Sequence, residues 1–200
     1  MTGSSASPPD EAPALDWSPA APAGDVFPTH RLVAPTSTRL ELRPTVHARR
    51  AVGVLVVLVV MFGGLSIGAA RAGEWWPAVF LLGMTLVFAT ITRFQVRRHF
   101  HQRIFDIRLG RYWTARTPEE RDRPTADVVS LAEIRGLQIT DEEVDGGEVN
   151  FTAYELNLVL ADGRRVNVVD HVRLRQIRDE AARIGALLGK PVWEKPGLGR

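Results

Sequence analysis

Two long uncharged runs, separated by only four residues, constrain this chain more than any other feature of its sequence. The runs cover residues 51–70 and 75–92, and Arg71-Ala72-Gly73-Glu74 lies between them. At about 1.5 Å per residue, a helix over the first run is roughly 30 Å long, which matches the hydrocarbon core of a bilayer. The first run holds eleven Val, Leu, Ile or Phe residues, which favour insertion by about 3 to 7 kcal/mol. The sequence therefore predicts a transmembrane helical hairpin with spans at 51–70 and 75–92.

Arginines lie at the outer ends of both spans. They are Arg39, Arg43, Arg49 and Arg50 before the first span, and Arg93, Arg97, Arg98 and Arg103 after the second. The connecting turn holds a single arginine, Arg71, beside Glu74. Because basic residues near a span stay on the cytoplasmic side, both termini are expected in the cytoplasm. Only two of the 25 basic residues are lysine, a bias typical of GC-rich bacterial genes, so the expected location is a bacterial inner (plasma) membrane.

No ionisable side chain lies inside either span. Intramembrane charges mark most transport pathways, so we interpret the hairpin as an anchor. Gly64 and Gly68 form a GxxxG pattern, which lets two helices approach closely. The pattern fits packing of the first helix on the second around Gly83, or a homo-oligomer through Gly64 and Gly68. The four-residue connection favours the first interpretation, because the second helix is already tethered nearby.

The sequence outside the hairpin, which we place at 47–99, divides into three parts. Residues 1–46 are rich in Pro and Ala and are expected to be a disordered cytoplasmic tail, in which Trp17 and Phe27 are isolated apolar residues. Within 36–44, the alternation of Leu40 and Leu42 fits a short added strand or a segment at the membrane surface. Residues 100–193 are expected to be a folded cytoplasmic domain, and residues 194–200 a flexible tail.

The domain at 100–193 shows six short alternating segments followed by one amphipathic stretch. In the clearest hairpin, residues 161–163 fit a three-residue loop that sets Leu158 opposite Val166 and Leu156 opposite Val168. Apolar residues at spacings of three and four then predict a helix over 174–188, ended by Gly189 and started by Asp170 or His171. Val192 and Trp193 are expected to fold back onto the domain.

This pattern predicts an α+β domain beside a membrane α-helical hairpin, with an antiparallel sheet of about six or seven strands closed by a C-terminal helix. The runs at 128–139 and 154–169, with the closing helix, resemble bacterial pleckstrin-homology-like (PH-like) domains attached to membrane hairpins. The resemblance implies a strongly bent seven-stranded sheet, with the seventh strand in 117–126 or 37–43. The first turn, Leu109-Gly110-Arg111, lacks the basic phosphoinositide-binding loop of some eukaryotic members.

No residue pattern indicates catalysis. The chain has no cysteine, which excludes disulfides, thiolate metal sites and cysteine nucleophiles. His99 and His101 lack a carboxylate at ligand spacing, so no metal is expected. Asp170-His171 at a strand-to-helix junction could suggest acid–base chemistry, but no matched nucleophile or glycine-rich phosphate loop accompanies it, and no catalytic residue or cofactor is predicted.

Seven arginines and one acidic residue lie between residues 93 and 116. This basic segment sets the topology, and it also offers lipid-headgroup candidates, namely Arg93, Arg97, Arg98 and Arg103. The net charge of +2 is too small to indicate a nucleic-acid partner. We expect a membrane-anchored interaction or scaffold module at the inner leaflet, with the lipid bilayer and a membrane or cytoplasmic protein as partners. The alternative is an anionic-lipid-sensing domain on a membrane anchor, and an enzyme is the least favoured class.

Overall fold

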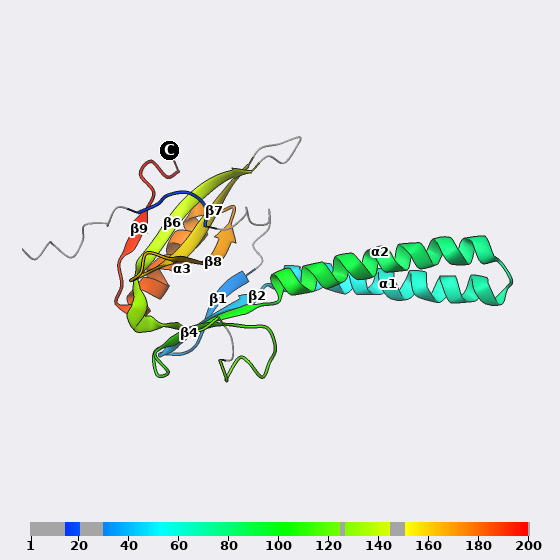
Figure 1. Ribbon diagram of the computed structural model, residues 1–200, viewed down its shortest axis with the longest axis horizontal. Coiled ribbons are helices and arrows are strands. Elements are labelled where there is room, and N and C mark those ends of the chain that lie inside the picture. Colours follow the sequence, from blue (N-terminus) through cyan, green and yellow to red (C-terminus); the bar gives the residue numbers. More distant parts are fainter. Residues whose placement is uncertain (1–14, 21–29, 125–126, 145–150, 200) are drawn as a thin grey trace, which may run out of the picture.

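The computed structural model describes residues 15–20, 30–124, 127–144 and 151–199, which form a helical hairpin joined to a domain of two β-sheets (Figure 1). The hairpin projects from the sheet domain as a long antiparallel pair of helices (Figure 1). Most of the expected N-terminal tail, residues 1–14 and 21–29 with Phe27, lies outside the described residues.

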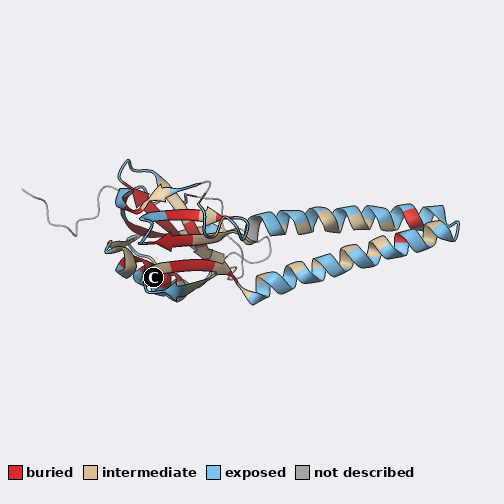
Figure 2. Ribbon diagram, turned by 90° about the horizontal axis from the view of Figure 1, so that it is seen from below, coloured by how far each residue is buried: buried red, intermediate tan, exposed pale blue. Residues whose placement is uncertain are grey.

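The hairpin consists of α1 (Val46–Arg71) and α2 (Trp75–His99). Thr45 starts α1, because its side-chain oxygen accepts a hydrogen bond from the Ala48 amide at 3.2 Å. Both helices are long and apolar enough to span a membrane, which confirms the two predicted spans at that level. Figure 2 shows exposed residues along almost the whole hairpin, although its apolar composition would suit a protein interior. The hairpin therefore presents its apolar side chains outward.

A few side chains hold the two helices together. The Phe62 and Phe88 rings stack with their centroids 5.4 Å apart. The Ser66 hydroxyl, which is buried, donates to the Ala78 carbonyl at 2.8 Å. Because residues 62 and 66 are one turn apart, they define the face of α1 that contacts α2.

The GxxxG pattern does not lie on this contact face. A Cβ added at Gly63 would lie 3.6 Å from the Thr85 side chain, whereas one added at Gly64, Gly68 or Gly83 would meet no described atom within 4 Å. The expected packing of Gly64 and Gly68 around Gly83 is therefore wrong. Phe62, Gly63 and Ser66 instead lie on the face of α1 that contacts α2.

The hairpin is an insertion between two neighbouring strands of the first sheet, sheet A. Its strands lie in the order β1 (His30–Thr36), β2 (Arg39–Pro44), β3 (Gln102–Asp106), β4 (Arg111–Ala115) and β5 (Val129–Ser130). β2 ends just before α1, and β3 begins just after α2. The two strands pair antiparallel, with Leu40 opposite Phe105 and Leu42 opposite Arg103.

The sheet domain therefore begins before the hairpin, unlike the predicted boundaries of a tail at 1–46 and a domain at 100–193. Residues 30–44 form β1 and β2, and Leu40 and Leu42 are buried in the core. Of the two expected places for an additional strand, 37–43 is the one the structure uses. The composition of the tail did not reveal this pairing, because the partner strand follows the hairpin.

The second sheet, sheet B, follows a short 3-10 helix at Leu131–Glu133. Its strands lie in the order β8 (Arg165–His171), β7 (Phe151–Leu160), β6 (Ile134–Val144) and β9 (Val192–Glu194). Leu158 faces Val166 as predicted, but a bulge sets Leu156 opposite Val169 rather than Val168. Gly163 adopts a φ of +84° in the preceding loop, where the sequence predicted a left-handed glycine.

The inner faces of both sheets enclose one apolar core together with α3 (Leu174–Leu188), and Figure 2 shows the buried residues gathered there. Ile177, Ala181 and Ile184 of α3 are fully buried, and Gly189 ends the helix with a φ of +62°. The described residues form nine strands in two sheets of five and four, because β1, β2 and β9 add to the six predicted strands. The predicted α+β class holds, but the expected single sheet is replaced by two.

The start of α3 differs from the prediction. Its N-cap residue is Arg173, which makes no side-chain capping bond. Asp170 instead accepts a hydrogen bond from the Asn167 amide at 2.7 Å. His171 lies against Glu180, with 3.1 Å between Nε2 and Oε2. Both residues therefore serve contacts within the domain.

The last described residues are bound to the domain, so the prediction of a flexible tail at 194–200 is wrong for 194–199. Glu194 forms an ion pair with Arg178 at 2.7 Å, and Lys195 forms one with Asp141 at 2.5 Å. Leu198 packs against the core. These contacts follow from β9, whose parallel pairing with β6 brings the chain back across sheet B.

Candidate functional site

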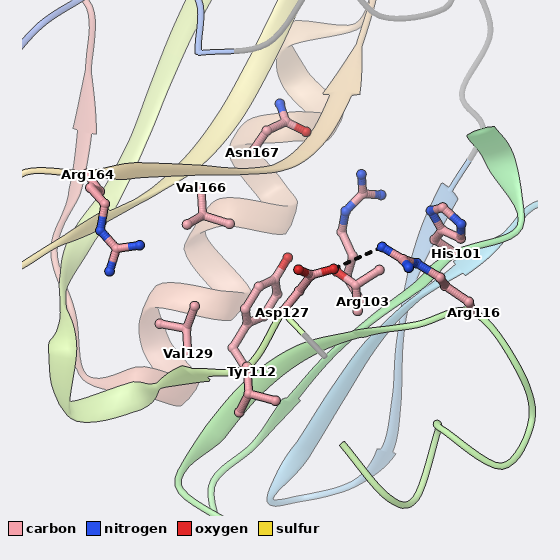
Figure 3. Close-up of a pocket in the computed structure, with 11 residues that line it drawn as sticks. His101, Arg103, Tyr112, Arg116, Asp127, Val129, Arg164, Val166 and Asn167 are labelled. Atoms are coloured by element: carbon pink, nitrogen blue, oxygen red, sulfur yellow. Dashed lines mark hydrogen bonds and ion pairs between the residues drawn. The ribbon is translucent and has the colours of Figure 1, made fainter. Parts of the chain in front are cut away.

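A pocket of about 420 Å³ lies between sheet A and β8 (Figure 3). Three arginines and one carboxylate line it, namely Arg103, Arg116, Arg164 and Asp127. His101, two residues after the end of α2, also lines the pocket, so the pocket lies at the side of the domain from which the hairpin leaves. The lining is therefore cationic and close to the base of the helices.

Strand register places the inner pocket residues. On the inner face of sheet A, Leu42 of β2 faces Arg103 of β3, and Arg103 faces Thr114 of β4. Because side chains alternate along a strand, Arg103 shares this face with Phe105, and Thr114 shares it with Tyr112. The face changes from apolar to polar at Arg103, where the core ends and the pocket begins. Figure 3 shows Arg103 and Tyr112 directed into the same space.

Tyr112 brings a buried hydroxyl to this pocket. The residue is 1% exposed, and its Oη has no hydrogen-bond partner among the described residues. Burial raises the pKa of Tyr112, and the Arg103 cation and the close approach of the Thr114 and Arg103 side chains to the hydroxyl offset part of that rise. The phenol is therefore protonated at neutral pH and can donate a hydrogen bond. A phenol and a guanidinium that donate into one space favour an anionic ligand.

The other two arginines are exposed and already paired. The Arg116 guanidinium lies 3.1 Å from the Asp127 carboxylate, and that of Arg164 lies 2.5 Å from Asp162. Exposed pairs of this kind contribute little to stability, so their partners can be exchanged at small cost. Both cations are available to a ligand that enters the pocket.

His101 completes the rim of the pocket next to the hairpin. Burial lowers the pKa of the imidazole, and the Arg116 and Arg103 cations lower it further. The ring is therefore neutral at pH 7. Its backbone carbonyl lies 2.8 Å from Nε2 of His30, which ties the start of β3 to β1.

Of the four predicted headgroup candidates, only Arg103 lies in the pocket that the described residues form. Arg93 and Arg97 are exposed near the end of α2, one helical turn apart. The side chain of Arg98 lies outside the described part of the molecule. Arg93 and Arg97 thus do not line the pocket with Arg103.

Sequence reasoning did not assign His101, Tyr112, Arg116 and Arg164 to a site. The turn at Gly110 indicated that the segments around it form a hairpin, and its register would have placed Tyr112 on the same face of the strand pair as Arg103. The approach of β8, which brings Arg164, depends on the packing of one sheet on the other. No local pattern carries that information.

The pair formed by His171 and Glu180 is the nearest approach to an acid–base constellation. Both side chains are buried, with exposures of 1% and 5%, so they do not reach a substrate. Within the described ranges, no group of three or more His, Asp or Glu residues is arranged to hold a metal ion.

Comparison of the chain with protein-family models, with curated proteins and with solved structures finds no match. The structure supports two apolar helices joined to a sheet domain, and the resemblance to PH-like proteins receives no support from these comparisons.

Proposed function

We propose that this protein is a membrane-anchored interaction module that holds its two-sheet domain against the inner leaflet of a bacterial plasma membrane. The observation that carries this proposal is the insertion of an apolar, outward-facing hairpin between the neighbouring strands β2 and β3. Exposed apolar helices of this length need lipid around them. The domain and its anchor are therefore one unit.

The connections between anchor and domain are short. Thr45 alone separates β2 from α1, and residues 100–101 separate α2 from β3. Two short links restrict both the height and the orientation of the domain above the bilayer, whereas one flexible linker would restrict neither. A module of this kind presents a fixed surface to partners at the membrane. The basic residues at the domain end of both helices support a cytoplasmic domain.

The domain itself we infer to be PH-like in the broad sense of strands closed by a C-terminal helix. Support comes from the confirmed β7–β8 hairpin and from α3, which ends at Gly189. The division into two sheets and the strands before the hairpin distinguish this chain from the expected single bent sheet.

The test is to fractionate cells that produce the full chain, wash the membranes with alkaline carbonate, and cross-link the protein in its native membrane. We expect the protein to stay in the washed membranes and to cross-link to a membrane or cytoplasmic protein. Release by carbonate would contradict the anchor. Retention without any cross-linked protein, using cross-linkers of several lengths, would contradict the interaction module.

A second candidate function, anionic-lipid sensing, is favoured by the cationic pocket. Arg103 and the Tyr112 hydroxyl, which is unpartnered among the described residues, face a space that opens near the base of the hairpin. A phosphate group there would accept hydrogen bonds from both, whether it belongs to a lipid headgroup or to a free anion.

Ligand titration of the protein in nanodiscs tests this candidate. The full chain in nanodiscs with 30% anionic lipid, or with neutral lipid only, can be compared by the NMR shifts of His101, with inorganic phosphate added to the neutral discs. A shift with anionic lipid alone assigns a headgroup, and a shift with phosphate alone assigns a soluble anion. No shift in either arm, or equal shifts in the Arg103→Gln variant, would exclude the pocket as an anion site.

A further inference from the structure

Residues 15–20 lie across the outer face of sheet B, the face turned away from sheet A (dark blue segment in Figure 1). The partners on the sheet come from three strands, with Gln138 and Thr140 on β6, Glu155 on β7 and Arg165 on β8. Their neighbours Leu137, Ile139 and Leu156 point into the core, so alternation turns the polar side chains outward.

Most of these contacts reach the backbone of the segment. The Gln138 amide donates to the Asp16 carbonyl and the Thr140 hydroxyl to the Trp17 carbonyl, each at 2.8 Å. The Ala20 amide donates to the Glu155 carboxylate at 2.9 Å. Backbone groups are common to every peptide, so this part of the site accepts any extended chain that can lie in the same path.

Arg165 adds recognition of side chains. Its Nη1 donates to the Asp16 and Ser18 carbonyls, at 2.9 and 2.5 Å. Its Nη2 lies 2.8 Å from the Asp16 carboxylate and 3.2 Å from the Ser18 hydroxyl. Ser18 in turn donates to the same carboxylate at 2.9 Å. One guanidinium therefore recognises a carboxylate and a hydroxyl that are two residues apart.

The chain's own segment satisfies this site incompletely. Gln138 and Asn157 are fully buried, and Glu155 is 5% exposed. Yet Oε1 of Gln138 and Oδ1 of Asn157 find no hydrogen-bond partner in the part of the chain that the structure describes. Buried acceptors without a donor are unfavourable, so a peptide that supplies donors at these two positions would bind more tightly than residues 15–20 do.

The segment is held mainly by polar contacts. Asp16, Ser18, Pro19 and Ala20 are exposed, and the side chains of Leu15 and Trp17, which are mostly buried, do not belong to the apolar core. The polar contacts can be replaced by water or by another peptide, and a competing peptide must also supply apolar side chains at these two positions. Residues 15–20 can therefore leave the sheet without opening the core.

From these contacts we propose that the outer face of sheet B is a binding site for an extended peptide segment of a partner protein, for which residues 15–20 compete. The partner segment carries a carboxylate and, two residues later, a hydroxyl. This inference rests on the proposed interaction module for its biological setting, but the site itself needs only the folded domain. It gives the module a surface and a chemical class of partner.

The experiment measures binding of a fluorescein-labelled peptide with the sequence of residues 15–20 to the full chain in detergent micelles. In the wild type, the tethered segment competes at an effective concentration on the order of 1 mM. Asp16→Lys removes that competitor, because it places a cation against Arg165. For a peptide with a dissociation constant near 0.1 mM, we expect the variant to bind about tenfold more tightly than the wild type.

Two site variants and one control complete the design. In the Asp16→Lys background, Arg165→Gln should weaken binding strongly, and Thr140→Val should weaken it severalfold. Thr140→Val is the smaller change and still tests the site where the first variant fails to fold. Asp179→Lys makes the same charge change on an exposed position of α3, which packs on the other face of sheet B, and should bind as the wild type does.

Equal affinities of wild type and Asp16→Lys, or binding that survives Thr140→Val unchanged, would overturn the proposal. A wild-type dimer that Asp16→Lys converts to a monomer would assign the site to a second copy of this chain and overturn the partner segment. Because micelles replace the bilayer, loss of peptide binding with intact carbonate resistance contradicts this inference alone. Carbonate release with intact peptide binding contradicts only the membrane anchor.

Discussion

At the scale of single residues, two buried polar groups hold the most informative positions. Tyr112 contributes its ring to the core, where it lies 4.7 Å from the Phe105 ring between centroids, but its hydroxyl has no partner within the described ranges. Asp170 carries a carboxylate into a largely buried position. Each side chain can be replaced by one of nearly the same shape that lacks the polar or charged group. The effect of that group on the free energy of unfolding can then be measured separately from the packing around it.

Replacing Tyr112 with Phe keeps the ring and removes the hydroxyl. Because a buried hydroxyl without a partner is unfavourable, the free energy of unfolding should stay within about 1 kcal/mol of the wild type or rise. If the pocket binds an anion, the phosphate-dependent NMR shift of His101 should weaken at the same time. A loss of several kcal/mol in chemical denaturation would show that the hydroxyl stabilises the fold instead.

Asp170 predicts a pH dependence of stability. Burial raises the pKa of its carboxyl, the Asn167 hydrogen bond opposes that rise, and the nearby Glu155 adds to it. The pKa in the folded state therefore lies above the pKa in the unfolded state. Below both values the group has no effect on the free energy of unfolding, and it makes the protein progressively less stable as pH rises through the interval between them.

Asp170→Asn keeps a carbonyl oxygen for Asn167 and removes the charge. Relative to the wild type, it should therefore stabilise the domain more at pH 7 than at pH 4. Urea unfolding at both pH values, followed by Trp fluorescence, measures the difference. A larger gain at pH 4 would reverse the expected sign and refute a raised pKa.

At the scale of elements, the hairpin makes the sharpest prediction. Val57 lies in the middle of α1 and is 65% exposed. An arginine there costs about 2.5 to 3.5 kcal/mol of insertion free energy, which is a large part of what the span gains. Val57→Arg should therefore shift much of the protein out of carbonate-washed membranes, and Val57→Leu, the matched control, should not. Equal retention of both variants would mean that the helix does not contact lipid.

The open glycines of α1 make a second prediction at this scale. Gly64 and Gly68 face away from α2, whereas Gly63 faces Thr85. We propose that a homo-oligomer, if formed, uses Gly64 and Gly68. Gly64→Leu should then lower cross-linking between copies and leave the hairpin intact, while Gly63→Leu should disturb the contact with Thr85. Unchanged cross-linking in Gly64→Leu would remove this face from any oligomer.

Elements differed in how far their sequence alone defined them. The apolar runs, the loop at Gly163 and the helix ended by Gly189 depend on neighbours in the chain, and all three were predicted. β1 and β2 were assigned to a tail because their partner, β3, lies beyond the hairpin. The bulge beside Leu156 pairs this residue with Val169 instead of the predicted Val168. The alternating pattern of apolar residues does not indicate where a bulge occurs.

At the scale of the whole molecule, the anchor and the two sheet faces form one arrangement. The hairpin leaves from sheet A, the cationic pocket lies near its base, and the peptide site lies on the outer face of sheet B. The arginines of the pocket could be read from the sequence. The packing of β8 against sheet A could not, and it forms the pocket that Arg103 lines, alone among the four predicted headgroup candidates in the described residues. It contained Trp17 as an isolated apolar residue but not the sheet face on which residues 15–20 lie.

We propose that the soluble residues before and after the hairpin lie on the cytoplasmic side of a membrane that the hairpin crosses twice. Because the chain has no cysteine, single cysteines can be introduced as Ala72→Cys in the turn and Glu119→Cys in an exposed loop of the domain. With a membrane-impermeant maleimide on intact spheroplasts, we predict labelling of the first and labelling of the second only after permeabilisation. Labelling of the domain position in intact spheroplasts, or protection of the turn, would contradict the account.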